Sequence, residues 1–176
     1  YDQSKGSETG EKIFQTNLYH YAGTGHLAID YAKLMRVGYD GLISEAKGKL
    51  EQLSMRDPEY NDKRDFYEAM IIMHEAAKKY IERYAELCMQ KAAEETDTQR
   101  RKELELMADN CRQIAGGAPQ TFWQAMQLFN IATTLIQVES NGHSISYGRM
   151  DQWLYPYYEK DIENGTITKE FALELI

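Results

Sequence analysis

The chain has 176 residues, a formal net charge of −8 and a pI near 5.1. Its basic residues are scattered among acidic ones, which argues against a nucleic-acid-binding surface. No apolar run approaches the roughly 20 residues that a membrane span needs, and the polar first residues lack the pattern of a signal peptide. The chain begins without methionine, and a helix start predicted at residues 168–171 comes just before Ile176, so we expect a piece of a longer protein.

The whole sequence divides into two segments. Residues 1–22 predict a polar arm and entry segment, and residues 23–176 predict a helical domain that is truncated at its C-terminus. Residues 23–25 (Gly-Thr-Gly) predict a sharp loop that lets the backbone fold closely around a ligand. His26 follows this loop directly. Judged on spacing alone, such a histidine is more often structural than catalytic.

Two long helices are predicted next. From Leu27 to about Leu53 the apolar residues recur at helical spacing, and we interpret Gly38 as a packing glycine where a neighbouring helix comes close. A second helix is predicted after Asp57 and Pro58, an N-cap acid followed by a first-turn proline. We interpret its apolar stripe as core, formed by Phe66, Met70, Met73, Ala77, Tyr80, Tyr84 and Leu87.

The spacing of the histidine and cysteine residues argues against a metal site and against a catalytic thiol. His74 and Glu75 open like a zinc-protease HExxH motif, but Lys78 stands where the second histidine ligand should be. None of the four histidines has the Glu-x-x-His spacing of a di-iron bundle, so we predict no metal site. Cys88 and Cys111 lack CxxC spacing, and we interpret them as buried free thiols of a reducing cytoplasm, with a catalytic thiol as the less favoured alternative.

A third and a fourth helix are predicted before the irregular segment at residues 139–158. Asp97 or Thr98 predicts the start of the third helix, and Gly116 with Gly117 predicts its end in the manner of a C-cap. The fourth helix, starting near Thr121, carries apolar residues around most of its circumference. A helix of this kind is buried on several sides and forms a rigid platform.

Residues 139–158 (ESNGHSISYGRMDQWLYPYY) follow that platform. Asn141 and Gly142 predict a tight turn, and the alternation that begins at Ser144 predicts a short strand reaching Gly148. Arg149 and Asp151 can pair at the strand end. The pattern fits a binding segment and a polar loop with a surface ion pair equally well.

Four stretches taken together resemble the glycyl radical enzymes of the pyruvate formate-lyase superfamily, and most of all their glycerol and diol dehydratase-like branch. They are Gly25 and His26 with Asp30 and Tyr31; DFYEAM at 65–70 with Arg83 and Tyr84; TFWQAMQ at 121–127; and NGHSISYGRMDQWLYPYY at 141–158. The resemblance implies a mainly α piece of packed long helices with one short strand, part of the helical wrapping of a ten-stranded α/β barrel. Helix faces meant for that barrel would then be exposed, and self-association is an expected consequence.

The resemblance also implies radical chemistry that this chain cannot perform alone. In the family, a glycyl radical near the C-terminus, installed by an activating enzyme with S-adenosylmethionine and an iron–sulfur cluster, generates a thiyl radical on a mid-chain cysteine. Neither motif is present, and Cys88 and Cys111 match no catalytic position of the family. The sequence RVGY around Gly38 is similar to the radical-glycine motif but lacks one residue between valine and glycine. We therefore expect this piece to be inactive by itself.

Residue by residue, the resemblance assigns a catalytic and substrate-binding role to His26 and a substrate-binding role to Ser144. An imidazole can give a proton to a leaving hydroxyl, and a serine hydroxyl can both donate to and accept from a diol. His143 is interpreted as structural. The implied partners are a small-molecule substrate, the radical-activating enzyme and a second subunit in a homodimer, with no nucleic acid and no membrane. The implied location is cytoplasmic, bacterial microcompartments included.

Two questions stay open at this stage. Glycerol, propanediol, choline, hydroxyproline and arylacetate enzymes share these motifs, so the substrate is not assigned. The alternative function is a non-catalytic helical interaction module that uses exposed aromatic residues, namely Trp153, Tyr155, Tyr157 and Tyr158.

Overall fold

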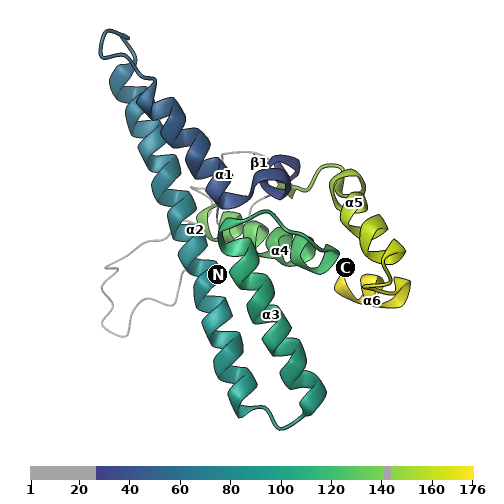
Figure 1. Ribbon diagram of the computed structural model, residues 1–176. Helices are drawn as coiled ribbons and strands as arrows, with labels where there is room; N and C mark the ends of the chain where they lie inside the picture. Colours follow the sequence, from purple (N-terminus) through teal and green to yellow (C-terminus); the bar gives the residue numbers. More distant parts are fainter. Residues whose placement is uncertain (1–26, 141–143) are drawn as a thin grey trace, which may run out of the picture.

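The computed structural model describes residues 27–140 and 144–176. Within these ranges it contains six helices and two short strands (Figure 1). In chain order they are β1 (Leu27–Ala28), α1 (Tyr31–Glu51), α2 (Tyr60–Glu94), α3 (Thr98–Gly116), α4 (Phe122–Ser140), β2 (Ile145–Ser146), α5 (Met150–Glu163) and α6 (Lys169–Leu175). The predicted class, mainly α with packed long helices, is confirmed.

The strands differ from the prediction in two respects. The strand expected from Ser144 to Gly148 covers only Ile145 and Ser146 (β2), and it pairs with a strand that was not predicted. That strand, β1, covers Leu27 and Ala28, where the helical pattern was expected to begin, and α1 starts only at Tyr31. Two residues are too few to show a period of two, so spacing could not separate β1 from the helix that follows.

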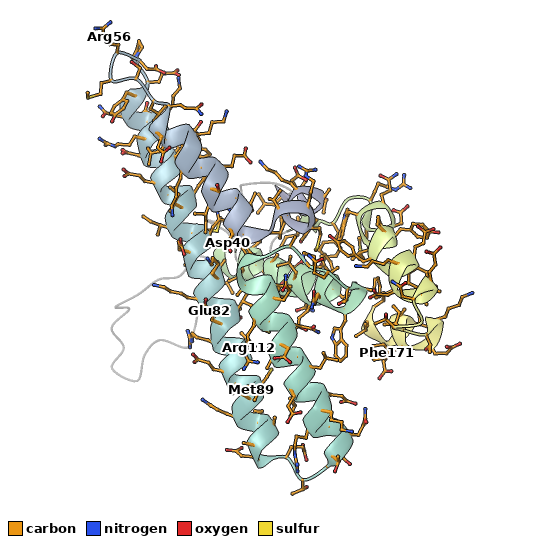
Figure 2. All side chains as sticks on the ribbon, viewed as in Figure 1. Asp40, Arg56, Glu82, Met89, Arg112 and Phe171 are labelled. Carbon is orange, nitrogen blue, oxygen red and sulfur yellow. The ribbon has the colours of Figure 1, made fainter. Side chains whose placement is uncertain are left out.

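α1 and α3 both pack along α2, the longest element (Figure 1). One part of α2 lies against α1 and the other against α3, and the beginning of α4 lies next to α5 and α6. Figure 2 shows Arg56 at the tip where α1 turns into α2, and Phe171 far from it on α6. One apolar core cluster joins residues from all six helices within the described ranges, and Phe171 extends it by packing edge-on against Trp123, with ring centroids 5.1 Å apart.

The apolar face of α2 corrects part of the core prediction. Phe66, Met73, Tyr84 and Leu87 are 60%, 41%, 42% and 44% exposed, so this part of the stripe is not core within the chain. Four of the six residues that α2 buries are small; the six are His74, Ala77, Ile81, Ala85, Cys88 and Ala92. Small side chains let α1 and α3 approach α2 closely, and the larger apolar residues fall on the neighbouring side of the helix.

Gly38 has the packing role predicted from the sequence. It bends α1, with φ of 64° and ψ of −177°, and lies against the end of α3. A Cβ atom at this position would overlap the backbone of Gly116 and Gly117, which form the C-terminal end of α3. The bend therefore depends on glycine both for its positive φ and for the close approach.

We predict that Gly38→Ala destabilises the α1–α3 contact. The positive φ alone costs about 1–2 kcal/mol for an L-residue, and the overlap with Gly116 and Gly117 adds to it. Denaturant unfolding and amide hydrogen exchange of α1 and α3 would measure the loss. Gly48→Ala is the matched control, because no atom lies within 4 Å of a Cβ there, and it should stabilise the helix by about 0.5–1 kcal/mol. Equal stability of the two variants contradicts the prediction.

Asp161 connects α5 to the start of α4. Its side chain is only 2% exposed, and Oδ2 accepts a hydrogen bond of 2.7 Å from the backbone N–H of Phe122. The Asp161 carbonyl accepts from the backbone N–H groups of Thr166 and Ile167. A carboxylate from one helix thus satisfies a free N–H at the beginning of another, as an N-cap residue does within its own helix.

Asp161→Ala is expected to weaken the first turn of α4. It leaves the buried Phe122 N–H without its acceptor, which costs about 1–3 kcal/mol. Asp161→Asn keeps an oxygen acceptor and should lose less. Hydrogen exchange of the α4 amides measures the effect of both substitutions. Asp109→Ala is the control, because Asp109 pairs with Arg112 on the surface. Unchanged protection of α4 in Asp161→Ala argues against the cross-helix cap.

Candidate functional site

The strand pair brings two segments together that lie far apart in the sequence. β1 and β2 run parallel, with Leu27 opposite Ile145 and Ala28 opposite Ser146. The backbone N–H of Leu27 donates a hydrogen bond of 3.0 Å to the carbonyl oxygen of Ser144. The start of the helical domain is thereby fixed against the segment that follows α4.

Ser144 has an unusual backbone conformation. Its φ is 41°, and among the residues that the structure describes it is the one non-glycine residue with positive φ. Its side chain is half-buried. Such conformations are sparsely populated and persist where the surroundings hold them, which is common at functional sites.

The other predicted site residue, His26, lies outside the described residues, as do His143 and the turn at Asn141 and Gly142. In the sequence His26 is the residue before Leu27, whose N–H donates to Ser144. The meeting of the His26 and Ser144 side chains therefore stays a prediction.

An aromatic cluster lies next to the strand pair, formed by Tyr31, Phe129, Tyr147 and Trp153. Tyr31 is 1% exposed and stacks on Trp153 with ring centroids 5.2 Å apart. Phe129 meets Tyr31 and Tyr147 edge-on, each with centroids 5.1 Å apart. Sequence reasoning missed this cluster, since it assigned Tyr31 to a helical stripe and treated Trp153 as an exposed aromatic residue.

Tyr31 also forms a hydrogen bond across the core. Its hydroxyl lies 2.7 Å from Oγ1 of Thr133 on α4. The Thr133 hydroxyl in turn donates to the carbonyl of Phe129 at 2.8 Å. Burial raises the pKa of Tyr31, and the hydrogen bond with Thr133 acts in the opposite direction. The phenol therefore stays protonated at neutral pH and can donate.

Arg149 and Asp151 form the predicted ion pair. Nε donates to Oδ1 at 3.0 Å and Nη2 donates to Oδ2 at 2.7 Å. The hydrogen bond from Arg149 lowers the pKa of Asp151, but both side chains are largely exposed, so the pair contributes little stability. Arg149 also borders a cavity of about 570 Å³ between α1 and α5, together with Arg36 and Trp153.

The two cysteines are buried and free, as predicted. Burial raises the pKa of both thiols, and the side-chain N–H of Gln127 donates to Sγ of Cys111 at 2.8 Å. Thiols with raised pKa values hold little thiolate and are poor nucleophiles. Within the described part of the chain, no group of three or more His, Cys, Asp or Glu side chains could hold a metal ion. None of the helices there is long and apolar enough to cross a bilayer.

Solved structures define the class of fold. The glycerol-bound form of the B12-independent glycerol dehydratase from Clostridium butyricum superposes with a TM-score of 0.81 at 39% identity, covering 92% of this chain and 22% of that one. A Roseburia inulinivorans structure concerned with 1,2-propanediol dehydration gives a TM-score of 0.83 at 33% identity, covering 92% of this chain and 21% of that one. The fold is thus that of a helical part of glycyl radical dehydratases.

The sequence comparisons identify the family. Residues 3–176 match the family described as Pyruvate formate lyase-like, and the chain belongs to this family. It is 75% identical over 175 residues to the (2S)-3-sulfopropanediol dehydratase of Klebsiella oxytoca, covering 99% of this chain and 21% of that protein. It is 44% identical over 156 residues to the probable dehydratase YbiW of Escherichia coli K12, covering 88% and 19%. The chain spans about a fifth of the length of these relatives.

The comparisons also settle the resemblance drawn from the four motif stretches. A glycyl radical enzyme of the diol dehydratase-like branch is confirmed as the family context of this chain.

Proposed function

We propose that this chain is part of a glycyl radical dehydratase that removes water from a small diol, and that the diol is (2S)-3-sulfopropanediol. The substrate proposal is supported by the 75% identity, over nearly the whole chain, to a dehydratase named for that compound. The relatives named for isethionate and for trans-4-hydroxy-L-proline are 34–39% identical to this chain.

One structural observation carries the assignment of the site. The hydrogen bond from Leu27 to the Ser144 carbonyl pairs the segment that begins directly after His26 with the segment that carries Ser144. Because strand register fixes which residues lie opposite each other, this pairing supports a common pocket for the two side chains. The strained backbone at Ser144 supports it further.

Each residue has a distinct role in this proposal. The His26 imidazole gives a proton to the oxygen of the leaving hydroxyl, so that water leaves in place of hydroxide. The Ser144 hydroxyl donates to one substrate oxygen and accepts from another, which fixes the orientation of the diol. The radical, when present, supplies the abstraction of a hydrogen atom from the substrate.

The radical machinery must come from outside these residues. The raised pKa values of Cys88 and Cys111, and their burial, do not fit a reactive thiol. We therefore propose that the full-length protein contributes the radical glycine, the thiyl cysteine and the barrel around the strand pair. An S-adenosylmethionine iron–sulfur activating enzyme, a homodimer and a cytoplasmic location complete the proposal.

The substrate is tested on the full-length protein after anaerobic activation, with the radical quantified by EPR. We expect kcat/KM for (2S)-3-sulfopropanediol to exceed that for glycerol and 1,2-propanediol by at least about 100-fold, since a site built for an anionic group leaves polar groups unpaired around a neutral diol. The aldehyde product is measured directly. A preference for a neutral diol would overturn the proposed substrate. If radical-bearing protein turns over no diol at all, the proposed dehydratase activity is overturned as well.

The site is tested by alanine variants of equal radical content. His26→Ala should keep the fold and lower kcat by about 10²–10⁴-fold, the usual contribution of a general acid. Ser144→Ala should raise KM and lower kcat by a smaller factor. Ser146→Ala is the matched control, because this serine is exposed on β2 and should turn over normally. Near-normal kcat in His26→Ala removes this residue from the mechanism.

A further inference from the structure

We propose that Tyr31 is a positioning residue: through its buried hydrogen bond with Thr133 and its stack on Trp153, it sets the pairing of β1 with β2 and hence the distance between the segments that carry His26 and Ser144. This inference rests on the proposed function and adds to it a residue that touches no substrate.

The strand pair needs such support because it is very short. Each strand has two residues, and two-stranded sheets are marginal in water even when they are longer. Tyr31 comes three residues after β1, and its backbone N–H donates to the Ile29 carbonyl at 2.9 Å. Tyr147 comes directly after β2, and its ring meets Tyr31 at 6.4 Å between centroids. The aromatic cluster therefore contains one residue close to the end of each strand.

The direction of the central hydrogen bond follows from the geometry. The Thr133 hydroxyl donates to the Phe129 carbonyl at 2.8 Å, so its oxygen is left to accept from Tyr31, 2.7 Å away. Tyr31 and Thr133 are 102 positions apart and are 1% and 9% exposed. A bond of this kind ties the start of α1 to the middle of α4 without competition from water.

The first part of α1 is held at its other end as well. The bend at Gly38 separates residues 31–37 from the long remainder of the helix. The hydroxyl of Tyr157 on α5 donates to the Met35 carbonyl at 2.9 Å. With Thr133 at one end and Tyr157 at the other, this short helical segment is fixed to α4 and α5, and β1 follows its position.

Positioning and simple stability predict different results. Loss of one neutral hydrogen bond lowers stability only modestly, because the stacked rings remain. A displacement of about 1 Å at a reacting group can lower the rate by about 10²-fold. A variant without the Tyr31 hydroxyl should therefore lose turnover out of proportion to its loss of stability.

The experiment compares variants of the activated full-length protein at equal radical content. We expect Tyr31→Phe to lower kcat by about 10–100-fold while KM changes by less than about 3-fold. Tyr155→Phe removes the same atom from a hydroxyl that donates to Glu159 on the surface, and it should leave kcat unchanged. Thr133→Val should match Tyr31→Phe, Thr133→Ser should restore kcat, and the double variant should lose no more than either single one.

Two kinetic results overturn the proposal. One is wild-type kcat in Tyr31→Phe. The other is a loss of kcat only in proportion to a loss of folded protein, without rescue by Thr133→Ser.

A second readout keeps this test independent of the proposed function. Hydrogen exchange at the amides of residues 27–29 and 145–147 reports the strand pairing whether or not any diol is turned over. Faster exchange there in Tyr31→Phe, with α2 and α3 unchanged, supports the positioning role. Unchanged exchange overturns it, even if the protein proves to have another activity.

Discussion

The packing around Tyr31 is the interaction that joins the strand pair to α4 and α5. This side chain contacts α4 through Phe129 and Thr133, and α5 through Trp153. It also contacts the segment after β2 through Tyr147. The helices determine where the chain runs, but two strands of two residues each cannot keep their pairing register without further support. The place where distant segments meet is therefore decided by side chains beside the sheet.

The bend at Gly38 makes this arrangement possible. Without it, α1 would continue as one straight rod along α2, and Tyr31 would be carried away from α4. The bend in turn requires the end of α3 at Gly116 and Gly117, where the absence of Cβ atoms lets two backbones touch. A contact between α1 and α3 thus governs the position of a strand that belongs to neither helix.

The sequence predicted several features that depend on residue type, but the predicted start of α2 at Asp57 and Pro58 was wrong, because α2 begins at Tyr60 with Glu59 at the N-cap. Asp97 accepts from the backbone N–H of Arg100 and caps α3, Gly117 ends that helix, and Gly38 lies where backbones approach, all as expected from residue type. The cap and the helix end need only a residue and its neighbours in the chain, whereas the packing of Gly38 also requires the end of α3, which is far away in the sequence. The roles of Ser144 and His26 rest on motif resemblance alone and stay predictions.

Spacing alone could not predict what depends on distant partners. β1 is too short to show a period, and the role of Tyr31 depends on Thr133, which is 102 positions away. The prediction that the whole apolar stripe of α2 is core was wrong for a related reason. Spacing shows that Phe66, Met73, Tyr84 and Leu87 share a face, but it does not show what covers them. An apolar face of this kind is unusual on a free monomer, and the chain spans about a fifth of its relatives.

The comparisons constrain where substrate choice can reside. Structures concerned with glycerol, with 1,2-propanediol and with trans-4-hydroxy-L-proline share this part of the fold with TM-scores of 0.79–0.83 at 31–39% identity. A backbone common to such different molecules cannot by itself distinguish them, because discrimination requires groups that one substrate satisfies and another leaves unpaired. Under the proposed function, the strand pair is therefore part of a common framework and does not select the substrate. Selection must reside in individual side chains around it, including those that the remaining four-fifths of such a protein contributes.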